Sequence, residues 1–202
     1  MAGYSILSLI DLINSKGETF SKKVLSSFSC PLNIDVEKFL TKGSAIEFAK
    51  QGLSQTFLVY ASFKKEQVLC GYFTICAKYI CISHSNVSKT LGRRLRKFSN
   101  SDVPGTYVIT SPLIAQLGKN FTNNYGGLIT GDELLKLSID KIKDAEQILG
   151  GKIVYVECED KEKLKSFYSD NGFVEFGKRN LDADERTQMC GKYLIQLLKY
   201  IN

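Results

Sequence analysis

The segment from residue 116 to residue 176 combines a glycine-containing loop with a tyrosine that could act as an acid. Gly126, Gly127 and Gly131 come just before a stretch with helical spacing. Backbone N–H groups of such a loop can approach an anion, and the helix N-terminus adds partial positive charge. Tyr168 lies on the next helical stretch, and a phenol placed there can donate a proton. The pattern predicts a phosphate-bearing ligand and an acid acting on it.

Each part also has a purely structural explanation. A glycine loop can simply connect a strand to a helix, and Tyr168 can be an aromatic side chain packed beside Phe167 and Phe173. The loop matches neither the P-loop nor the G-x-G-x-x-G pattern, which disfavours ATP and NAD as ligands.

The elements that must position these residues alternate between strand and helix patterns. Asp35 is a plausible N-cap and Gly52 a helix stop, and Pro112 predicts a bulge or an edge position in its strand. Tyr4–Asn14 fits a strand or a helix.

The expected strands are Gln55–Ser62 and Val68–Ser83, which form a hairpin, then Thr106–Gly118, Ile153–Val156, Phe173–Phe176 and Tyr193–Leu198. The expected helices are Asp35–Lys50, Ser85–Ser99, Asp132–Leu149 and Asp160–Asp170. The fold class is therefore α/β, with a mixed sheet and βαβ units in its second half.

Length and composition predict one domain over residues 1–202. Of the 202 residues, 44% are apolar, which is enough for a core, and 24% are charged. No apolar run reaches the roughly 18–20 residues of a membrane span, and the first residues lack the basic region of a signal peptide. We expect a cytoplasmic protein that does not enter a membrane.

The cysteines predict free thiols rather than a metal site. None of them forms a C-x-x-C pair, and His84 is the only histidine. Buried thiols in a reducing cytosol are the favoured interpretation, and a disulfide or a metal role is the alternative. The six cysteines are Cys30, Cys70, Cys76, Cys81, Cys158 and Cys190.

The net charge is +6, and basic residues cluster between Lys89 and Lys97. A solvated helix face explains this cluster. A surface that attracts a polyanion explains it as well.

The ordered combination of these elements resembles the GNAT acetyltransferases. The segment from Lys161 to Phe173 is similar to the family's A-x-x-F-Y-x-x-x-G-F segment, with Leu164 at the small position. Glu133-Leu134-Leu135 resembles the start of the family's cofactor helix. The family's loop signature is Q/R-x-x-G-x-G/A, and in the window from Gly126 to Gly131 only the last glycine matches. The resemblance implies a mostly antiparallel central sheet flanked by helices.

The upstream sequence resembles one branch of that family. Phe28-Ser29-Cys30, the Val36–Leu40 segment and Gln55–Val59 are similar to the opening of this branch, and Cys70–Thr74 to its next strand. The branch contains the acetyltransferase toxins of bacterial toxin–antitoxin pairs, which acetylate the amino group of aminoacyl-tRNA.

By this resemblance, acetyl-CoA would be the co-substrate, and no metal would be needed. The acetyl carbonyl and pantetheine would lie along the strand at Leu117, Gly118 and Lys119. One strand N–H near Leu117 would stabilise the oxyanion, and Tyr168 would protonate the leaving sulfur. The diphosphate would lie over Gly126, Gly127, Leu128, Ile129, Thr130, Gly131 and Asp132.

The general base is the least defined part of this scheme. Glu157 and Glu159 are candidates for a base or for substrate contacts, and His84 is expected to be structural. A neutral amine needs no base.

The resemblance implies an N-acetyltransferase acting on a primary amine by direct attack. Two alternatives are a toxin-type enzyme acting on aminoacyl-tRNA and a non-catalytic acyl-CoA-binding domain. The implied partners are acetyl-CoA, an amine acceptor, tRNA, an antitoxin and a second copy of the chain. In the tRNA case the RNA backbone would be held by Arg93 and Arg94, together with Lys89, Arg96, Lys97, Lys178 and Arg179.

Overall fold

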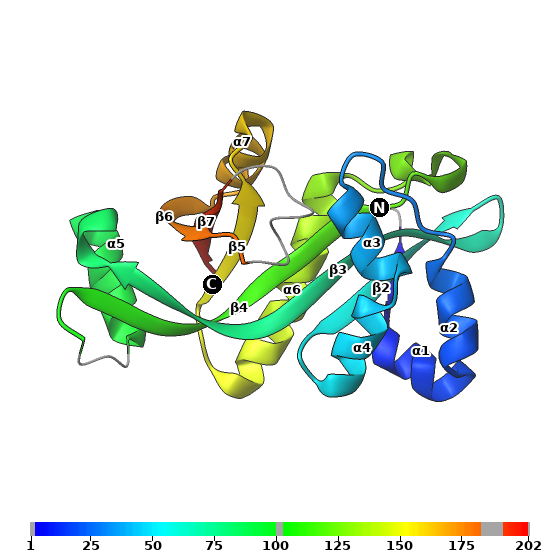
Figure 1. Ribbon diagram of the computed structural model, residues 1–202, viewed down its shortest axis with the longest axis horizontal. Helices are drawn as coiled ribbons and strands as arrows, with labels where there is room; N and C mark the ends of the chain where they lie inside the picture. Colours follow the sequence, from blue (N-terminus) through cyan, green and yellow to red (C-terminus); the bar gives the residue numbers. More distant parts are fainter. Residues whose placement is uncertain (1–2, 100–102, 183–191, 202) are drawn as a thin grey trace. The chain divides into compact units, whose positions relative to one another are not determined.

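The computed structural model describes residues 3–99, 103–182 and 192–201 (Figure 1). Their contacts divide the chain into two compact units, residues 1–76 with 114–140 and residues 77–113 with 141–202. The strands β3 (Glu66–Ser83) and β4 (Thr106–Lys119) and the helix α6 (Gly131–Leu149) pass from one unit into the other. The single domain expected over residues 1–202 stays a prediction.

The strands follow one another in the order β1-β2-β3-β4-β5-β7-β6. The pairs β1–β2, β2–β3, β5–β7 and β6–β7 are antiparallel. This confirms the expected α/β class with a mostly antiparallel mixed sheet. The remaining strands are β1 (Tyr4–Ser8), β2 (Gln55–Phe63), β5 (Ile153–Glu159), β6 (Val174–Asn180) and β7 (Tyr193–Tyr200).

The hairpin of the first unit is confirmed. β2 and β3 are joined by Lys64 and Lys65, which have φ angles of +50° and +69°. Two successive left-handed residues match the twist of an antiparallel pair. The segment Tyr4–Asn14 contains a strand and then a helix, because β1 ends at Ser8 and α1 covers Leu9–Lys16.

The single helix expected over Asp35–Lys50 is wrong. The chain forms α3 (Ile34–Thr41) and α4 (Ser44–Gln51), separated at Gly43, whose φ of +104° interrupts the helix. The N-cap of α3 is Asn33 rather than Asp35, since the Asn33 side chain accepts from the N–H groups of Asp35 and Val36. The stop at Gly52 is confirmed by its left-handed φ of +72°. A further helix, α2 (Glu18–Leu25), precedes these two.

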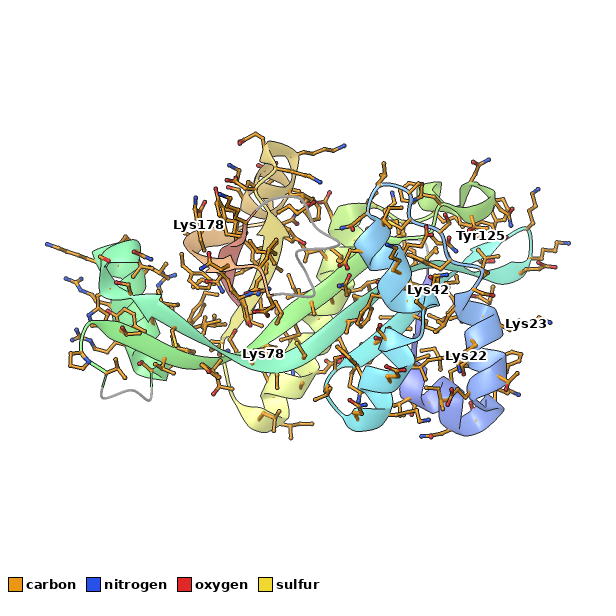
Figure 2. The ribbon with its side chains drawn as sticks, viewed as in Figure 1. Lys22, Lys23, Lys42, Lys78, Tyr125 and Lys178 are labelled. Atoms are coloured by element: carbon orange, nitrogen blue, oxygen red, sulfur yellow. The ribbon has the colours of Figure 1, made fainter. Side chains whose placement is uncertain are left out.

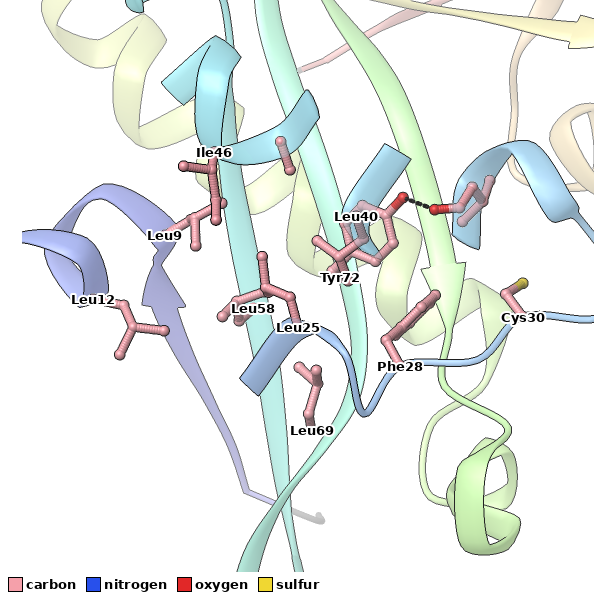
Figure 3. Close-up of a cluster of buried hydrophobic side chains, with 12 residues drawn as sticks. Leu9, Leu12, Leu25, Phe28, Cys30, Leu40, Ile46, Leu58, Leu69 and Tyr72 are labelled. Carbon is pink, nitrogen blue, oxygen red and sulfur yellow. Dashed lines mark hydrogen bonds between the residues drawn. The ribbon is translucent and has the colours of Figure 1, made fainter. Parts of the chain in front are cut away.

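Each face of the sheet in the first unit has its own core. On one face α1 to α4 pack over β2 and β3, and the buried Tyr72 hydroxyl donates to the Val36 carbonyl at 2.6 Å (Figure 3). On the other face Val59 and Phe73 pack against Ile129 and Leu134, so the start of α6 lies on that side. The alternation of side chains along a strand produces these two cores.

The second unit contains the basic helix, which is shorter than expected. The α-helical part, α5, covers Lys89–Leu95, and a 3-10 turn lies on either side of it. Its cap is Ser88, whose hydroxyl accepts from the Leu91 N–H at 3.2 Å. Of the bulge or edge position expected at Pro112, the edge position is wrong, because β4 lies between β3 and β5, and the bulge stays a prediction.

The expected helix and turn before the last strands are confirmed. The helix α7 covers Glu162–Asp170, and Gly172, with φ of +79°, turns the chain into β6. The last expected strand is β7, which pairs with both β5 and β6.

Five cysteines are free thiols, of which Cys30, Cys70, Cys76 and Cys158 are buried. Cys81 is exposed, which contradicts its expected burial. Cys190 lies outside the described residues. No helix in the described ranges has both the length and the apolar character to cross a bilayer.

Candidate functional site

The strand end at Gly118 is shaped by packing within the first unit. A Cβ placed on Gly118 would lie 2.4 Å from Val36 Cγ1 and 3.2 Å from the Phe28 ring. A Cβ on Gly71 would lie 3.0 Å from the Gly118 carbonyl oxygen. Glycine is therefore required at Gly118 because α3 and β3 approach it closely. Leu117 packs on the opposite face, against the core that contains Phe73.

A buried asparagine fixes the chain just after this strand, and the sequence reasoning missed it. Asn120 is 1% exposed. Its Oδ1 accepts from the N–H groups of Ser29 at 3.0 Å and Thr122 at 3.1 Å, and its Nδ2 donates to the Leu69 carbonyl at 2.9 Å. These bonds position the start of the glycine loop relative to β3.

The glycine loop begins with a 3-10 turn over Thr122–Gly127. A Cβ on Gly126 would lie 2.8 Å from the Phe121 ring, so this glycine serves internal packing. A Cβ on Gly127 would meet nothing within 4 Å, which leaves its backbone open. Ile129 is 1% exposed and belongs to the core. Of these loop residues, Gly127 has the backbone best suited to a close ligand.

The start of α6 is closed by a reciprocal cap between Thr130 and Glu133. Glu133 Oε2 accepts from Thr130 N and from Thr130 Oγ1, both at 2.8 Å. Thr130 Oγ1 accepts in turn from Glu133 N at 3.1 Å. This is a capping box, which satisfies donors that the helix itself leaves free. Bonding to Thr130, first to its backbone N–H, lowers the pKa of Glu133, so this carboxylate is charged at neutral pH.

Two further side chains of the first unit interact with this cap. The Tyr4 hydroxyl donates to the Leu128 carbonyl at 3.1 Å. Burial, followed by its interaction with the Glu133 carboxylate, raises the pKa of Tyr4 to about 12. Lys119 attracts Glu133 electrostatically, and its Nζ lies 5.9 Å from the Phe121 ring centroid.

The loop therefore fits a bound diphosphate only in part. Gly127 offers open backbone, and Lys119 offers positive charge. The Glu133 carboxylate, however, is bonded to the Thr130 N–H at the helix end where a phosphate would be stabilised. The Thr130 N–H is therefore not available to a phosphate while Glu133 accepts from it.

Tyr168 lies in an aromatic cluster of the second unit. It is 9% exposed, and its ring packs edge-to-face against Phe167 and Phe173, with centroids 5.0 and 5.6 Å away. The Phe173 N–H donates to the Tyr168 carbonyl at 3.0 Å, which ties the following turn to α7. Burial raises the pKa of Tyr168, and Cys158 adds to that effect, so the phenol stays protonated at neutral pH.

The two candidate bases, Glu157 and Glu159, are both engaged in ion pairs within the second unit. Glu157 accepts from Arg179 Nε and from Gln196 Nε2, each at 2.8 Å, and its side chain is 12% exposed. Glu159 pairs with Lys161 at 2.5 Å.

Basic and aromatic side chains together line a hollow of about 390 Å³ in the second unit, formed by Arg94, Lys97, Phe98 and Tyr200. The Arg94 guanidinium lies 5.8 Å from the Tyr200 ring centroid, and Phe98 meets that ring edge-to-face at 6.0 Å. Arg93, on the same helix, is exposed. The sequence reasoning placed positive charge here but missed the aromatic partners, because Tyr200 comes from a distant strand.

The remaining sequence candidates have local roles. Lys178, labelled in Figure 2, lies with its Nζ 4.3 Å from the Tyr193 ring centroid. His84 lies against Tyr107, with ring centroids 4.1 Å apart. Asp132 is in the first turn of α6, and its side chain is exposed. Within residues 3–99, 103–182 and 192–201, no cluster of three His, Cys, Asp or Glu side chains could hold a metal ion.

Comparison with solved structures identifies the fold. A structure of AtaT complexed with acetyl-methionyl-tRNAfMet matches with a TM-score of 0.61 and 17% identity, covering 96% of this chain and 94% of that one. A tyrosine-to-phenylalanine mutant of KacT matches with a TM-score of 0.61 and 16% identity over 96% and 94% of the two chains. A mutant of the toxin AtaT, bound to acetyl-CoA and the C-terminus of the antitoxin AtaR, matches with a TM-score of 0.60 and 16% identity. The match covers 98% of this chain and 92% of that one.

Comparison of the sequence gave no further relative. No family model matches the chain, and no curated protein matches it. The structural likeness nevertheless extends over nearly the whole length of both chains. The chain therefore has the GNAT fold of AtaT and KacT.

Proposed function

We propose that the protein is an acetyl-CoA-dependent N-acetyltransferase that transfers an acetyl group to a primary amine by direct attack. The observation that carries this proposal is the fold likeness to AtaT, which has been solved with acetyl-CoA and with an acetylated aminoacyl-tRNA. Within this chain the supporting features are the open backbone at Gly127 and the buried, protonated phenol of Tyr168.

In this proposal acetyl-CoA supplies an acyl group already activated as a thioester. The strand residues Leu117 to Lys119 bind the acetyl and pantetheine parts through their backbone. One N–H near Leu117 stabilises the oxyanion, with a contribution of about 3 kcal/mol by analogy with single oxyanion donors. The backbone from Gly126 to Asp132 binds the diphosphate after Glu133 has moved.

Tyr168 serves as the general acid for the leaving sulfur. Its pKa is raised by burial from an ordinary value near 10, whereas a thiol has a pKa near 8.5. Complete proton transfer is therefore uphill by about 2 kcal/mol or more. A strong hydrogen bond from the phenol to the sulfur in the transition state accounts better for its role than early proton transfer.

No dedicated base is required in this scheme. Because Glu157 and Glu159 are ion-paired, an amine that is already neutral is the preferred nucleophile. The α-amino group of an aminoacyl ester is less basic than a lysine amine, so a larger fraction of it is neutral at pH 7.

The decisive experiment measures thiol release from acetyl-CoA with a panel of amines, alongside calorimetric titration with acetyl-CoA. The panel contains lysine peptides, polyamines and aminoacyl-tRNA. Binding with turnover supports the proposal. Binding without turnover for every amine favours the alternative of a non-catalytic acyl-CoA-binding domain, and absence of binding contradicts both.

A second candidate acceptor is aminoacyl-tRNA, and the hollow of Arg94, Lys97, Phe98 and Tyr200 favours it. Cations hold phosphates, and aromatic rings stack on unpaired bases, so this lining suits an RNA end. The test compares tRNA binding by Arg94→Ala/Lys97→Ala with binding by Lys22→Ala/Lys23→Ala, which removes two exposed lysines from α2 in the other unit. We expect only the first variant to bind more weakly and to lose part of the salt dependence. Equal binding by the two variants would contradict the assignment.

A further inference from the structure

The carboxylate of Glu133 occupies the anion position at the start of α6. It accepts two hydrogen bonds from Thr130, one of them from a backbone N–H. Backbone N–H groups at a helix end are the donors that an anionic ligand uses. The negatively charged Glu133 side chain thus accepts from the Thr130 N–H, which belongs to the segment that the proposed function assigns to the diphosphate.

The hydrogen bonds between the Glu133 side chain and Thr130 can be broken by a movement of that side chain alone. The side chain is exposed; it bonds to Thr130, three residues earlier, and also interacts with the Tyr4 side chain. The helix itself is held by other residues, since Leu134 and Leu135 are 1% and 0% exposed. A change in the Glu133 side-chain rotamer therefore frees the Thr130 N–H without moving α6.

Positive charge close by gives an incoming anion a further partner. Lys119 attracts the Glu133 carboxylate electrostatically. When that carboxylate leaves, the ammonium of Lys119 is free to attract a phosphate instead, so the exchange replaces one anion by another. Tyr4 lies against the same group and donates to the Leu128 carbonyl.

We propose that Glu133 is a specificity-determining residue of the acyl-CoA site. Its carboxylate competes with the diphosphate for the amides at the start of α6, and the diphosphate binds only when the carboxylate swings out. This inference rests on the proposed function, because acyl-CoA is the ligand that brings a diphosphate to this loop. It also gives a reason for the negative charge of Glu133 at the start of α6, because a carboxylate fixed there would repel a permanently bound phosphate.

The test is the variant Glu133→Gln. A glutamine retains an oxygen that accepts from the Thr130 N–H, so the capping box survives while the negative charge is removed. Calorimetric titrations with CoA, inorganic pyrophosphate and pantetheine compare this variant with the wild-type protein. Asp140→Asn is the matched control, because Asp140 is an exposed acid on the same helix that pairs with Lys136.

We expect Glu133→Gln to bind CoA and pyrophosphate roughly fivefold more tightly, because a neutral amide holds the Thr130 N–H less strongly than a carboxylate does. Binding of pantetheine, which lacks the diphosphate, should not change. Asp140→Asn should behave as the wild type with all three probes. Unchanged affinity of Glu133→Gln for CoA, or an equal gain for pantetheine, overturns the inference.

The two proposals fail in distinguishable ways. If the wild type acetylates an amine and Glu133→Gln binds CoA no more tightly, the role of Glu133 is refuted and the proposed function stands. If neither protein releases thiol with any amine, yet Glu133→Gln binds pyrophosphate more tightly, the proposed function is refuted and the role of Glu133 stands.

Discussion

The guanidinium of Arg179 on β6 donates to the carboxylate of Glu157 on β5 at 2.8 Å, across the intervening strand β7. Gln196 on β7 donates to the other oxygen of the same carboxylate at 2.8 Å. The three side chains connect neighbouring strands of the second unit on one face of the sheet. Because both oxygens of Glu157 already accept hydrogen bonds, this residue is better suited to holding the strands together than to removing protons.

The variant Glu157→Gln should therefore lower stability more than turnover. A glutamine amide keeps one oxygen to accept from Arg179 but removes the charge of that ion pair, and Gln196 must turn its own amide to present an oxygen to the new NH2 group. We expect a loss of about 1–2 kcal/mol in the free energy of unfolding, measured by urea denaturation, with thiol release changed by less than threefold. Abolished turnover with unchanged stability would instead identify Glu157 as the base.

The variant Tyr168→Phe should lower kcat by roughly tenfold or more, the lower range of general-acid effects. The phenylalanine ring retains the packing against Phe167 and Phe173, so the fold should be preserved. Tyr60→Phe is the control, because Tyr60 is a half-buried tyrosine on β2. Equal turnover of the wild type and Tyr168→Phe would remove this hydroxyl from the mechanism.

Two glycine-to-alanine changes should separate packing from ligand approach. Gly118→Ala places a Cβ 2.4 Å from Val36, which should cost about 1–3 kcal/mol of stability through overpacking. Gly127→Ala meets nothing within 4 Å, so its melting temperature should match the wild type. If Gly127 faces the diphosphate, the same variant should bind CoA more weakly. A stable Gly118→Ala variant would show that α3 can move away from β4.

Stability should fall in alkaline solution, and Tyr4 should contribute to the loss. Burial and the nearby Glu133 carboxylate raise the pKa of Tyr4 to about 12, against about 10 in the unfolded chain. The unfolded state thus releases its proton first, so this contribution is complete below pH 10 and is lost between pH 10 and pH 12.

Urea midpoints measured at pH 8, 9, 10 and 10.5 test this assignment. The decrease above pH 9 should be smaller in Tyr4→Phe than in the wild type, because the variant has no phenol to ionise. Tyr79→Phe, at a side chain that is 70% exposed, should follow the wild type. Parallel curves for the wild type and Tyr4→Phe would contradict the assignment.

Local patterns predicted most elements of this fold because their causes are local. The hairpin from β2 to β3, the helix α6 with its stop at Gly150, and the turn at Gly172 all depend on residues close in sequence. The division of Asp35–Lys50 into two helices was missed, although Gly43 marks it, because the apolar spacing continues across the break. The edge position of Pro112 failed because strand order is set by distant pairings.

From Gln55 onward the sequence by itself determined the order of strands and helices, the glycine loop before α6 and the Phe-Tyr and Asn-Gly-Phe segments, all of which follow from propensity, spacing and turn chemistry. Only the tertiary structure decided what surrounds the candidate side chains. It paired Glu157 with Arg179, buried Asn120 under three hydrogen bonds and brought Tyr200 beside Arg94. Burial and charge pairing set the pKa and reach of a side chain, and both arise between residues far apart in the chain.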